Sequence, residues 1–343
     1  GDCPRRLWRR KAAGLVRGGL AQGPQHGSNQ GMPTSLPTVT IDDTTTFSSN
    51  NATDTDTDSP APDSIASGDD QDNDDLFGST ITRSSTVNNE PVRFDFNNDG
   101  VADILWRNGN NGANRIWFMD DDGKRSTQAN PGNLGKAWDV AGVDDFNDDG
   151  VADILWRNGN NGANRIWFMD DNGKRSTQAN PGRLGTAWDV AGVADFNDDD
   201  VADILWRNGN NGANRIWFMN DNGKRNSQAN PGKLGKAWDV AGVDDFNDDG
   251  VADILWRNGN NGANRIWFMN DDGKRSTQAN PGKLGKAWDV AGVDDFNNDG
   301  VADILWRNGN NGANRIWFMD DDGTLDSSVN PGNLGKAWDV AGM

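Results

Sequence analysis

One unit of 50 residues recurs five times in the second part of the chain, and this repeat limits the folds that the chain can adopt. Asp103, Asp153 and Asp203 stand in the same local context, and residues 101–119 return unchanged in every copy. Self-similarity at a fixed period is typical of architectures in which each unit packs against its neighbours. Because this stretch is identical in all five copies, the repeat alone does not separate functional from structural residues there.

Each unit contains four short segments with the apolar alternation or the β-branched and aromatic content of strands. In the second copy these predicted strands are residues 138–143, 152–158, 165–169 and 174–179. A Gly/Asn-rich turn at residues 159–164 separates the second strand from the third. Residues 171–173 form a tight hairpin turn in which Gly173 can take a positive φ. Because no stretch has a clean 3.6-residue period, helices are not expected.

Four antiparallel strands in each of five copies predict an all-β fold, a β-propeller with one four-stranded blade per repeat. The two middle strands are apolar on both faces, as strands sandwiched between neighbouring blades must be. The small residues of the DVAGV strand suit a crowded axis, and the polar KRSTQA strand suits an exposed edge. A solenoid is the alternative, although its repeats seldom use four strands.

The closure of the propeller depends on a spare strand. Residues 91–94 (PVRF) can supply the first strand of the first blade, which leaves residues 338–343 without a blade of their own. We favour a closed ring of five blades, in which the spare strand displaces residues 91–94. The alternative is an incomplete propeller that stops one strand into a sixth blade and must form oligomers.

Residues 1–92 differ in composition from residues 93–343, and we predict a disordered low-complexity region or linker followed by the propeller domain. Residues 32–89 are rich in Thr, Ser, Asp, Asn and Pro, and such a stretch cannot bury enough apolar surface to offset its ordering entropy. The basic start at residues 5–20 is a poor signal peptide because Arg17 interrupts its short apolar run.

Composition excludes several classes of function. The net charge is −19, and an acidic chain is a poor general binder of nucleic acid. One Cys and one His allow neither a disulfide framework nor a Cys/His zinc site, and no run approaches the ~18 apolar residues of a membrane span. We expect no enzymatic activity, because the repeat region has no His, Cys, Glu or Tyr to serve as the usual catalytic base.

The connection between the first and second predicted strands has oxygen ligands at the spacing of a cation site. In the first copy it reads D-x-N-x-D-G-x-x-D, so that Asp95, Asn97 and Asp99 can converge if the backbone turns at the glycine. The carbonyl of Val101 and the side chain of Asp103 can complete the shell. Three carboxylates with oxygen-only ligation suit Ca²⁺, whereas Mg²⁺ prefers a smaller octahedral shell. The alternative is an ordinary Asx turn on an acidic surface.

This loop between two strands, inside a repeat of about 50 residues, resembles the FG-GAP/VCBS repeat family, the blades of integrin-α-type propellers. The resemblance covers residues 93–343 and rests on DFNNDGVADILWRN and its four successors. It implies Ca²⁺ in the blade loops and an extracellular role in adhesion or ligand binding. The chain departs from the family in having five blades rather than seven, DVAGV in place of the FG-GAP motif, and Asp200 where the other loops have Gly.

The resemblance implies up to five calcium ions, one in each loop. Their side-chain ligands would be Asp95, Asn97, Asp99, Asp103, Asp145, Asn147, Asp149, Asp153, Asp195, Asn197, Asp199, Asp203, Asp245, Asn247, Asp249, Asp253, Asp295, Asn297, Asp299 and Asp303. The carbonyl ligands would be Val101, Val151, Val201, Val251 and Val301. The repeat region has 26 basic and 39 acidic residues, so five ions would change its net charge from −13 to −3.

Two further groups of residues have more than one interpretation. The three Trp of each copy, such as Trp106, Trp117 and Trp138, can stack against sugars or fill the space between blades, and we favour packing. Arg and Asn residues around the turn after the second strand can bind a polar ligand or form a solvated tip. The full group in the first copy is Arg107, Asn108, Asn111, Asn114 and Arg115.

We therefore expect a secreted or surface-displayed, calcium-binding β-propeller that serves as a binding or adhesion module for a protein or glycan. We expect neither nucleic-acid binding nor membrane insertion. The alternatives are a carbohydrate-binding lectin of similar shape and a structural, non-catalytic domain of a larger secreted protein.

Overall fold

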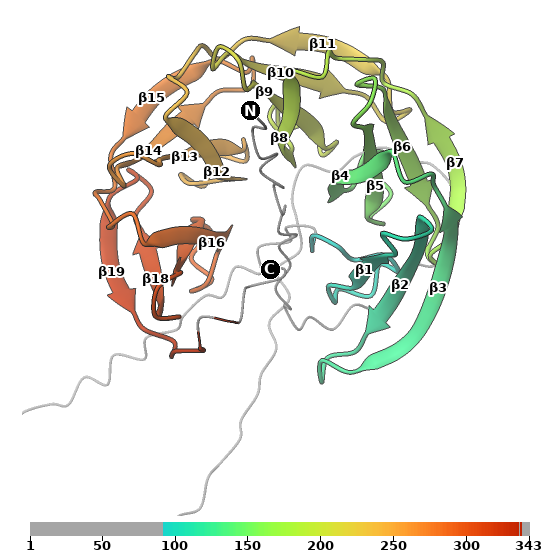
Figure 1. The fold of residues 1–343 in the computed structure, drawn as a ribbon, viewed down its shortest axis with the longest axis horizontal. Helices are drawn as coiled ribbons and strands as arrows, with labels where there is room; N and C mark the ends of the chain where they lie inside the picture. Colours follow the sequence, from blue (N-terminus) through green and yellow to red (C-terminus); the bar gives the residue numbers. More distant parts are fainter. Residues whose placement is uncertain (1–91, 336, 338–343) are drawn as a thin grey trace, which may run out of the picture. The chain divides into compact units, whose positions relative to one another are not determined.

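The computed structural model describes residues 92–335 and Ala337, and all the regular secondary structure in this part is β-strand. Nineteen strands form five antiparallel sheets, one from each repeat. Figure 1 shows the sheets arranged around a common centre as the blades of a propeller, which confirms the predicted fold. The predicted disordered region, apart from Val92, lies outside the described residues. Within the described residues, no helix is long and apolar enough to cross a membrane.

The blades follow one another in chain order. Blade 1 is a three-stranded sheet of β1 (Ile104–Arg107), β2 (Ala113–Met119) and β3 (Arg125–Asn133). Blade 2 contains β4 (Trp138–Asp144), β5 (Asp153–Asn158), β6 (Asn164–Met169) and β7 (Arg175–Ala179). Blade 3 contains β8 (Trp188–Ala194), β9 (Asp203–Asn208), β10 (Asn214–Met219) and β11 (Arg225–Ala229). Blade 4 contains β12 (Trp238–Asp244), β13 (Asp253–Asn258), β14 (Asn264–Met269) and β15 (Arg275–Ala279). Blade 5 contains β16 (Trp288–Asp294), β17 (Asp303–Asn308), β18 (Asn314–Met319) and β19 (Leu325–Val329).

Each blade has two ends, because its strands alternate in direction. The loop end carries the connection between the first and second strands and the hairpin between the third and fourth; in blade 2 these are residues 144–153 and 169–175. The turn end carries the turn between the second and third strands and the linker to the next blade, residues 157–165 and 180–189 of the same repeat. The predicted cation loops therefore all lie at the loop end.

Apolar cores fill the spaces between neighbouring blades. Between blades 2 and 3, Leu155 and Phe168 on one sheet pack in a single cluster with Ile204, Trp206 and Trp217 on the next. The two Trp rings of a blade lie against each other, with centroids 4.8 Å apart in blade 3. Burial of one such ring stabilises the fold by about 5 kcal/mol. The prediction that these two Trp of each repeat are packing residues is confirmed for blades 2 to 5.

An arginine at the end of the second strand ties each blade to the next. In blade 2, Arg157 donates from Nη1 to Asn164 Oδ1 at 2.9 Å and from Nη2 to the carbonyl oxygens of Leu184 and Trp188 at 3.1 and 2.6 Å. Its guanidinium carbon lies 4.8 Å from the centroid of the Trp206 ring in blade 3. This arginine, which sequence reasoning placed among candidate ligand-binding residues, is a structural bracket between a turn, a linker and a neighbouring core.

Small residues on the innermost strands allow the blades to meet near the axis, as the sequence predicts. A Cβ atom on Gly142 of β4 would lie 2.6 Å from Val193 Cγ1 of β8, and Gly192 and Gly242 stand in the same relation to the next blade. Any side chain at these positions would force neighbouring blades apart.

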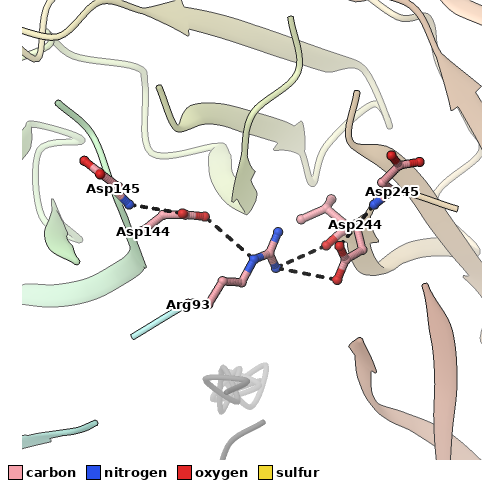
Figure 2. Close-up of polar contacts among 6 residues, drawn as sticks. Arg93, Asp144, Asp145, Asp244 and Asp245 are labelled. Carbon is pink, nitrogen blue, oxygen red and sulfur yellow. Dashed lines mark hydrogen bonds and ion pairs between the residues drawn. The ribbon is translucent and has the colours of Figure 1, made fainter. Parts of the chain in front are cut away.

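Residues 92–94 do not form the first strand of blade 1. Arg93 instead lies between Asp144 of blade 2 and Asp244 of blade 4, as Figure 2 shows. Its Nε lies 3.9 Å from Asp144 Oδ2, its Nη1 lies 4.0 Å from Asp244 Oδ2, and Nη1 also donates to the Val243 carbonyl oxygen at 3.4 Å. Burial raises the pKa of Asp144 to about 6, and the positive charge of Arg93 opposes that rise.

The large apolar side chains that are exposed in the described part of the chain lie at the two ends of the blade array. They are Ile104 and Trp106 in blade 1, and Leu325, Val329 and Leu334 in or directly after blade 5. The four apolar clusters of the described residues join blades 1 to 2, 2 to 3, 3 to 4 and 4 to 5. Residues 338–343, the predicted closing strand, lie outside the described residues, so ring closure stays a prediction.

The end blades permit a test with two equivalent residues. Trp106 is 46% exposed, whereas Trp206, at the same position of an identical segment, is fully buried. We expect Trp206→Ala to lower the free energy of unfolding by about 3–5 kcal/mol and Trp106→Ala to lower it by less than half as much. Chemical denaturation of the two variants measures the difference. Equal losses would contradict this expectation and would support the closed ring that the sequence favours.

Candidate cation site in the blade loops

The first aspartate of each loop organises the backbone of the turn. In blade 2, Asp145 Oδ1 accepts the Asn147 N–H at 3.0 Å and Oδ2 accepts the Gly150 N–H at 2.7 Å. Asp149 Oδ1 accepts the Val151 N–H at 2.9 Å. These are the side chain-to-backbone bonds of Asx turns, the alternative that the sequence left open. The same bonds recur in the other loops, so the turn is a property of the repeat.

The last aspartate of the loop lies in the interior beneath it. Asp153 Oδ1 accepts the Met169 N–H at 2.8 Å, and Oδ2 accepts the Phe146 N–H at 3.2 Å, which ties the start of the loop to the end of β6. Burial raises the pKa of Asp153 to about 8, because removal from water disfavours the charged form more than these two hydrogen bonds favour it. Burial likewise raises the pKa of Asp203 and of Asp253 to about 8.

The asparagine of the loop has a buried oxygen without a hydrogen-bond donor. Asn147 Nδ2 donates to Asp149 Oδ2 at 2.8 Å, and this bond fixes the orientation of the amide. Asn147 Oδ1 is then left buried and unpartnered, as are the equivalent oxygens of Asn97, Asn197 and Asn247. An unsatisfied buried acceptor costs about 1–3 kcal/mol. The orphaned oxygen therefore fits a cation that takes oxygen ligands.

The structure brings the predicted ligands of each repeat into one loop, but it does not gather them into a ready cage. Within the described residues, no group of three or more Asp, Glu, His or Cys side chains is arranged to hold a metal ion. The physical reason is that the carboxylates are engaged with backbone amides of their own loop. The five valines that were predicted to offer carbonyl ligands are buried at the base of the loops: Val101, Val151, Val201, Val251 and Val301. A bound cation would exchange part of these amide bonds for metal–oxygen contacts.

Neighbouring loops are joined through their backbones. The Ala202 N–H of blade 3 donates to the Asp145 carbonyl oxygen of blade 2 at 2.8 Å, and the Ala152 N–H donates to the Asp95 carbonyl oxygen at 2.7 Å. The loop of one blade also fits closely against the glycine of the next, because a Cβ on Gly150 would lie 2.8 Å from Asn98 Nδ2. The loops therefore form a connected row rather than five separate sites.

The third loop differs from the others at one position, as the sequence indicates. Asp200 has a φ of 62°, in the left-handed region that the glycines of the other loops occupy, such as Gly150 at 79°. Its N–H still donates to Asp195 Oδ2 at 2.7 Å. The loop geometry is thus retained, at the energetic cost of a left-handed conformation in a residue with a side chain.

Sequence reasoning did not place the third-to-fourth-strand hairpins beside the cation loops. In the structure a depression at the loop end is lined by Asn247 and Asp248 of one loop, Asp299 of the next, and the hairpin residues Asp320 and Asp321. The Asp and Asn residues before each hairpin glycine are the sequence signal for this proximity, but this signal can be interpreted only once the blades are known to be adjacent. The loop end is strongly acidic as a result.

Comparison with known proteins agrees with this arrangement. The FG-GAP-like repeat model matches residues 95–156, 145–206 and 245–306, and each match runs from one loop to the second strand of the following blade. No curated protein matches the chain.

Several solved structures are similar in fold. A lectin of Agrocybe aegerita, described as recognising non-reducing terminal N-acetylglucosamine, is 17% identical to this chain and has a TM-score of 0.55. The match covers 73% of this chain and 68% of the lectin chain. The Photorhabdus luminescens Tc holotoxin pore is 12% identical, and the match covers 71% of this chain and 12% of the holotoxin chain, with a TM-score of 0.47. A chain of a nidogen/laminin complex is 14% identical, and the match covers 62% of this chain and 73% of the chain in the complex, with a TM-score of 0.41.

At 17% identity the lectin supports the fold alone. The family matches, in contrast, fall on the loops and strands described above and together span just over half of the chain, and the chain therefore belongs to the FG-GAP-like repeat family.

Proposed function

We propose that this chain is a calcium-stabilised binding or adhesion module that works outside the cell or at its surface. The observation that carries the calcium proposal is the buried, unpartnered Oδ1 of Asn97, Asn147, Asn197 and Asn247. In each case the amide is oriented by its own Nδ2 donation to a carboxylate, so the oxygen is not free to find another donor.

The residues that would hold the ion come from a single loop. In blade 2 they are Asn147 through its orphaned oxygen, Asp145 and Asp149 through their carboxylates, and the predicted contributions of Val151 and Asp153. The ion would supply positive charge that neutralises the loop carboxylates. The chain supplies the turn that brings these oxygens together and the buried brace of Asp153 that fixes the loop to β6.

A binding role is supported by the family and by the absence of usual catalytic groups from the repeats, which contain no His, Cys, Glu or Tyr. The lectin of similar fold recognises a terminal sugar, and this supports glycans as one ligand class. The buried Trp of blades 2 to 5 are not available for sugar stacking, so a lectin site would have to use the exposed Trp106 of blade 1 or the half-buried Trp188 and its equivalents at the turn end.

Calcium should raise the thermal stability of the protein. We expect a clear increase in Tm with excess Ca²⁺ over chelator, because ions that bind only the native state stabilise it by mass action. The increase should be larger at pH 8 than at pH 6. Asp153, Asp203 and Asp253 have pKa values near 8, and they must lose protons before they can help to hold a cation. Differential scanning calorimetry at both pH values measures the effect.

Two variants of Asn147 test the role of its unpartnered oxygen, and one serves as the control for the other. Asn147→Asp keeps an oxygen at the site, whereas Asn147→Ala removes it, and only the second variant should lose about one ion of the calcium stoichiometry. Superimposable melts with Ca²⁺ and with chelator would contradict the calcium proposal.

The third loop should bind calcium most weakly. Asp200 reaches the left-handed region at a cost that glycine does not have, and the ligands must converge to within a few tenths of an ångström. We expect Asp200→Gly to strengthen the third site and Gly150→Asp to weaken the second. Isothermal titration calorimetry of the parent and both variants measures this. Equal affinities, or a weaker site in Asp200→Gly, would show that the additional carboxylate matters more than the backbone strain.

Ligand binding should be tested with the calcium-loaded full chain. A glycan array that includes terminal N-acetylglucosamine, together with a panel of immobilised extracellular-matrix proteins, covers both proposed ligand classes. Saturable binding to a defined glycan or protein, lost with chelator, supports a binding module. Failure to bind any member of either panel would leave the structural-domain alternative.

A further inference from the structure

The two ends of the blades carry opposite charge. In the described residues, the loop ends and outer strands hold thirty-four Asp against nine Lys or Arg, Arg93 included, whereas the turn ends hold sixteen Lys or Arg against four Asp. The basic residues of the turn ends are Arg107, Arg115, Lys136, Arg157, Arg165, Arg183, Arg207, Arg215, Lys233, Lys236, Arg257, Arg265, Lys283, Lys286, Arg307 and Arg315. The acidic residues there are Asp139, Asp189, Asp239 and Asp289.

Part of this positive charge belongs to exposed side chains on the linkers between blades. Lys233 and Lys236 lie on the linker after blade 3, and Lys283 and Lys286 lie on the linker after blade 4; all four are exposed. No ion pair joins any of them to a carboxylate within the described residues. These lysine side chains are therefore accessible to a partner in solvent.

The linkers hold these cations in fixed, repeated positions. The Leu234 N–H donates to the Gly212 carbonyl oxygen at 3.1 Å, and the backbone of Lys233 forms a bridge with Ala213. Arg207 donates to the Leu234 carbonyl oxygen at 3.2 Å from the other side. Because the next linker is held in the same way, each blade presents its cations at an equivalent place. A regular row of positive charge suits a partner with regularly spaced negative charge.

The acidic loop ends do not cancel this basic surface at physiological salt. A strand of six residues spans about 20 Å, and the Debye length at 0.15 M ionic strength is about 8 Å. Charges at one end of a blade are therefore largely screened from a ligand at the other. The net charge of −19, from which the sequence argued against nucleic-acid binding, does not describe the turn ends.

The aromatic rings at the turn ends favour a polysaccharide over a nucleic acid. Arg165, Arg215, Arg265 and Arg315 lie over the half-buried rings of Trp138, Trp188, Trp238 and Trp288, at 4.9–5.3 Å from the centroids. Single-stranded nucleic acid is bound through open aromatic faces on which bases stack. Here a guanidinium already covers one face of each ring, while exposed asparagine amides of the neighbouring turns, such as Asn210 and Asn211, can hydrogen-bond to hydroxyl groups.

We propose that the turn ends of blades 3 and 4, with their linkers, form the docking surface for an anionic polysaccharide. The surface offers lysine ammonium groups to carboxylate or sulfate groups and asparagine amides to sugar hydroxyls. This proposal rests on the proposed function as a binding module and specifies its ligand class and its face.

The test uses two charge-reversal variants of the full chain that differ only in the end that they change. The turn-end variant is Lys233→Glu/Lys236→Glu/Lys283→Glu/Lys286→Glu. The control variant is Lys124→Glu/Lys174→Glu/Lys224→Glu/Lys274→Glu, which makes the same change in net charge at exposed positions of the loop end. Heparin, chondroitin sulfate, neutral dextran and single-stranded DNA are the probes, in 0.15 M salt with Ca²⁺.

The parent should bind heparin or chondroitin sulfate and not dextran. The turn-end variant should lose about tenfold or more in affinity, and the control variant should stay within about twofold of the parent. No binding by the parent, equal losses in both variants, or tighter binding of DNA than of either polysaccharide would each overturn the proposal. Salt-sensitive self-association of the parent that is abolished by the turn-end variant would overturn it as well, because the partner would then be the acidic end of a second copy.

The thermal melts with calcium and the glycan and protein panels test the proposed function independently of the polysaccharide proposal. If the parent binds a neutral glycan or a protein and the turn-end variant retains that binding, the proposed function stands and the anionic ligand class is wrong. If the parent binds no probe and no panel member, the binding module itself is wrong.

Discussion

A sheet that is apolar on both faces cannot be stable alone in water, and this constraint determines how the blades of this protein assemble. Ile204 and Trp206 on one face of blade 3 need the Leu155 and Phe168 face of blade 2, and the opposite face of blade 3 needs blade 4 in turn. Between blades 2 and 3, Arg157 adds three hydrogen bonds to the linker and the start of β8, together with a contact to the Trp206 ring, while its two other hydrogen bonds stay within blade 2. Identical repeats thus produce identical interfaces, and stability is a property of neighbouring pairs.

The same constraint couples the candidate cation loops to the blade interfaces. Asp153 lies under its loop and bonds to the backbone at the end of β6, while the loop carbonyl of Asp145 accepts an N–H from the next blade. A cation that tightens one loop would therefore act on the adjacent interface as well as on its own blade. This gives a physical reason to look for the effect of calcium in global stability rather than only in local loop order.

The strands, the blade count and the loop positions could be predicted from the sequence because they follow from periodicity, alternation and turn chemistry within one repeat. The packing role of Trp156 could be predicted on the same basis. The role of Arg157 could not, since its acceptors are mostly backbone carbonyls of a distant linker that carry no sequence signal. Arg93 was missed for a similar reason: its partners Asp144 and Asp244 are brought near it only by the arrangement of the blades.

Position in the array changes what an identical residue does. Trp106 and Trp206 have the same neighbours in sequence, yet one ring is nearly half exposed and the other is buried. The reason is that Trp206 packs against the preceding blade, whereas no blade precedes Trp106 in the described residues. The last repeat is also the one whose outer strand has changed most, from RSTQA to LDSSV, which replaces the arginine that covers a Trp ring in the other blades with Leu325. Since the inner copies keep that arginine and the terminal copy does not, the divergence falls where the repeat no longer has a following blade in the described structure. Differences among near-identical repeats are therefore best interpreted from the neighbour that each copy has or lacks.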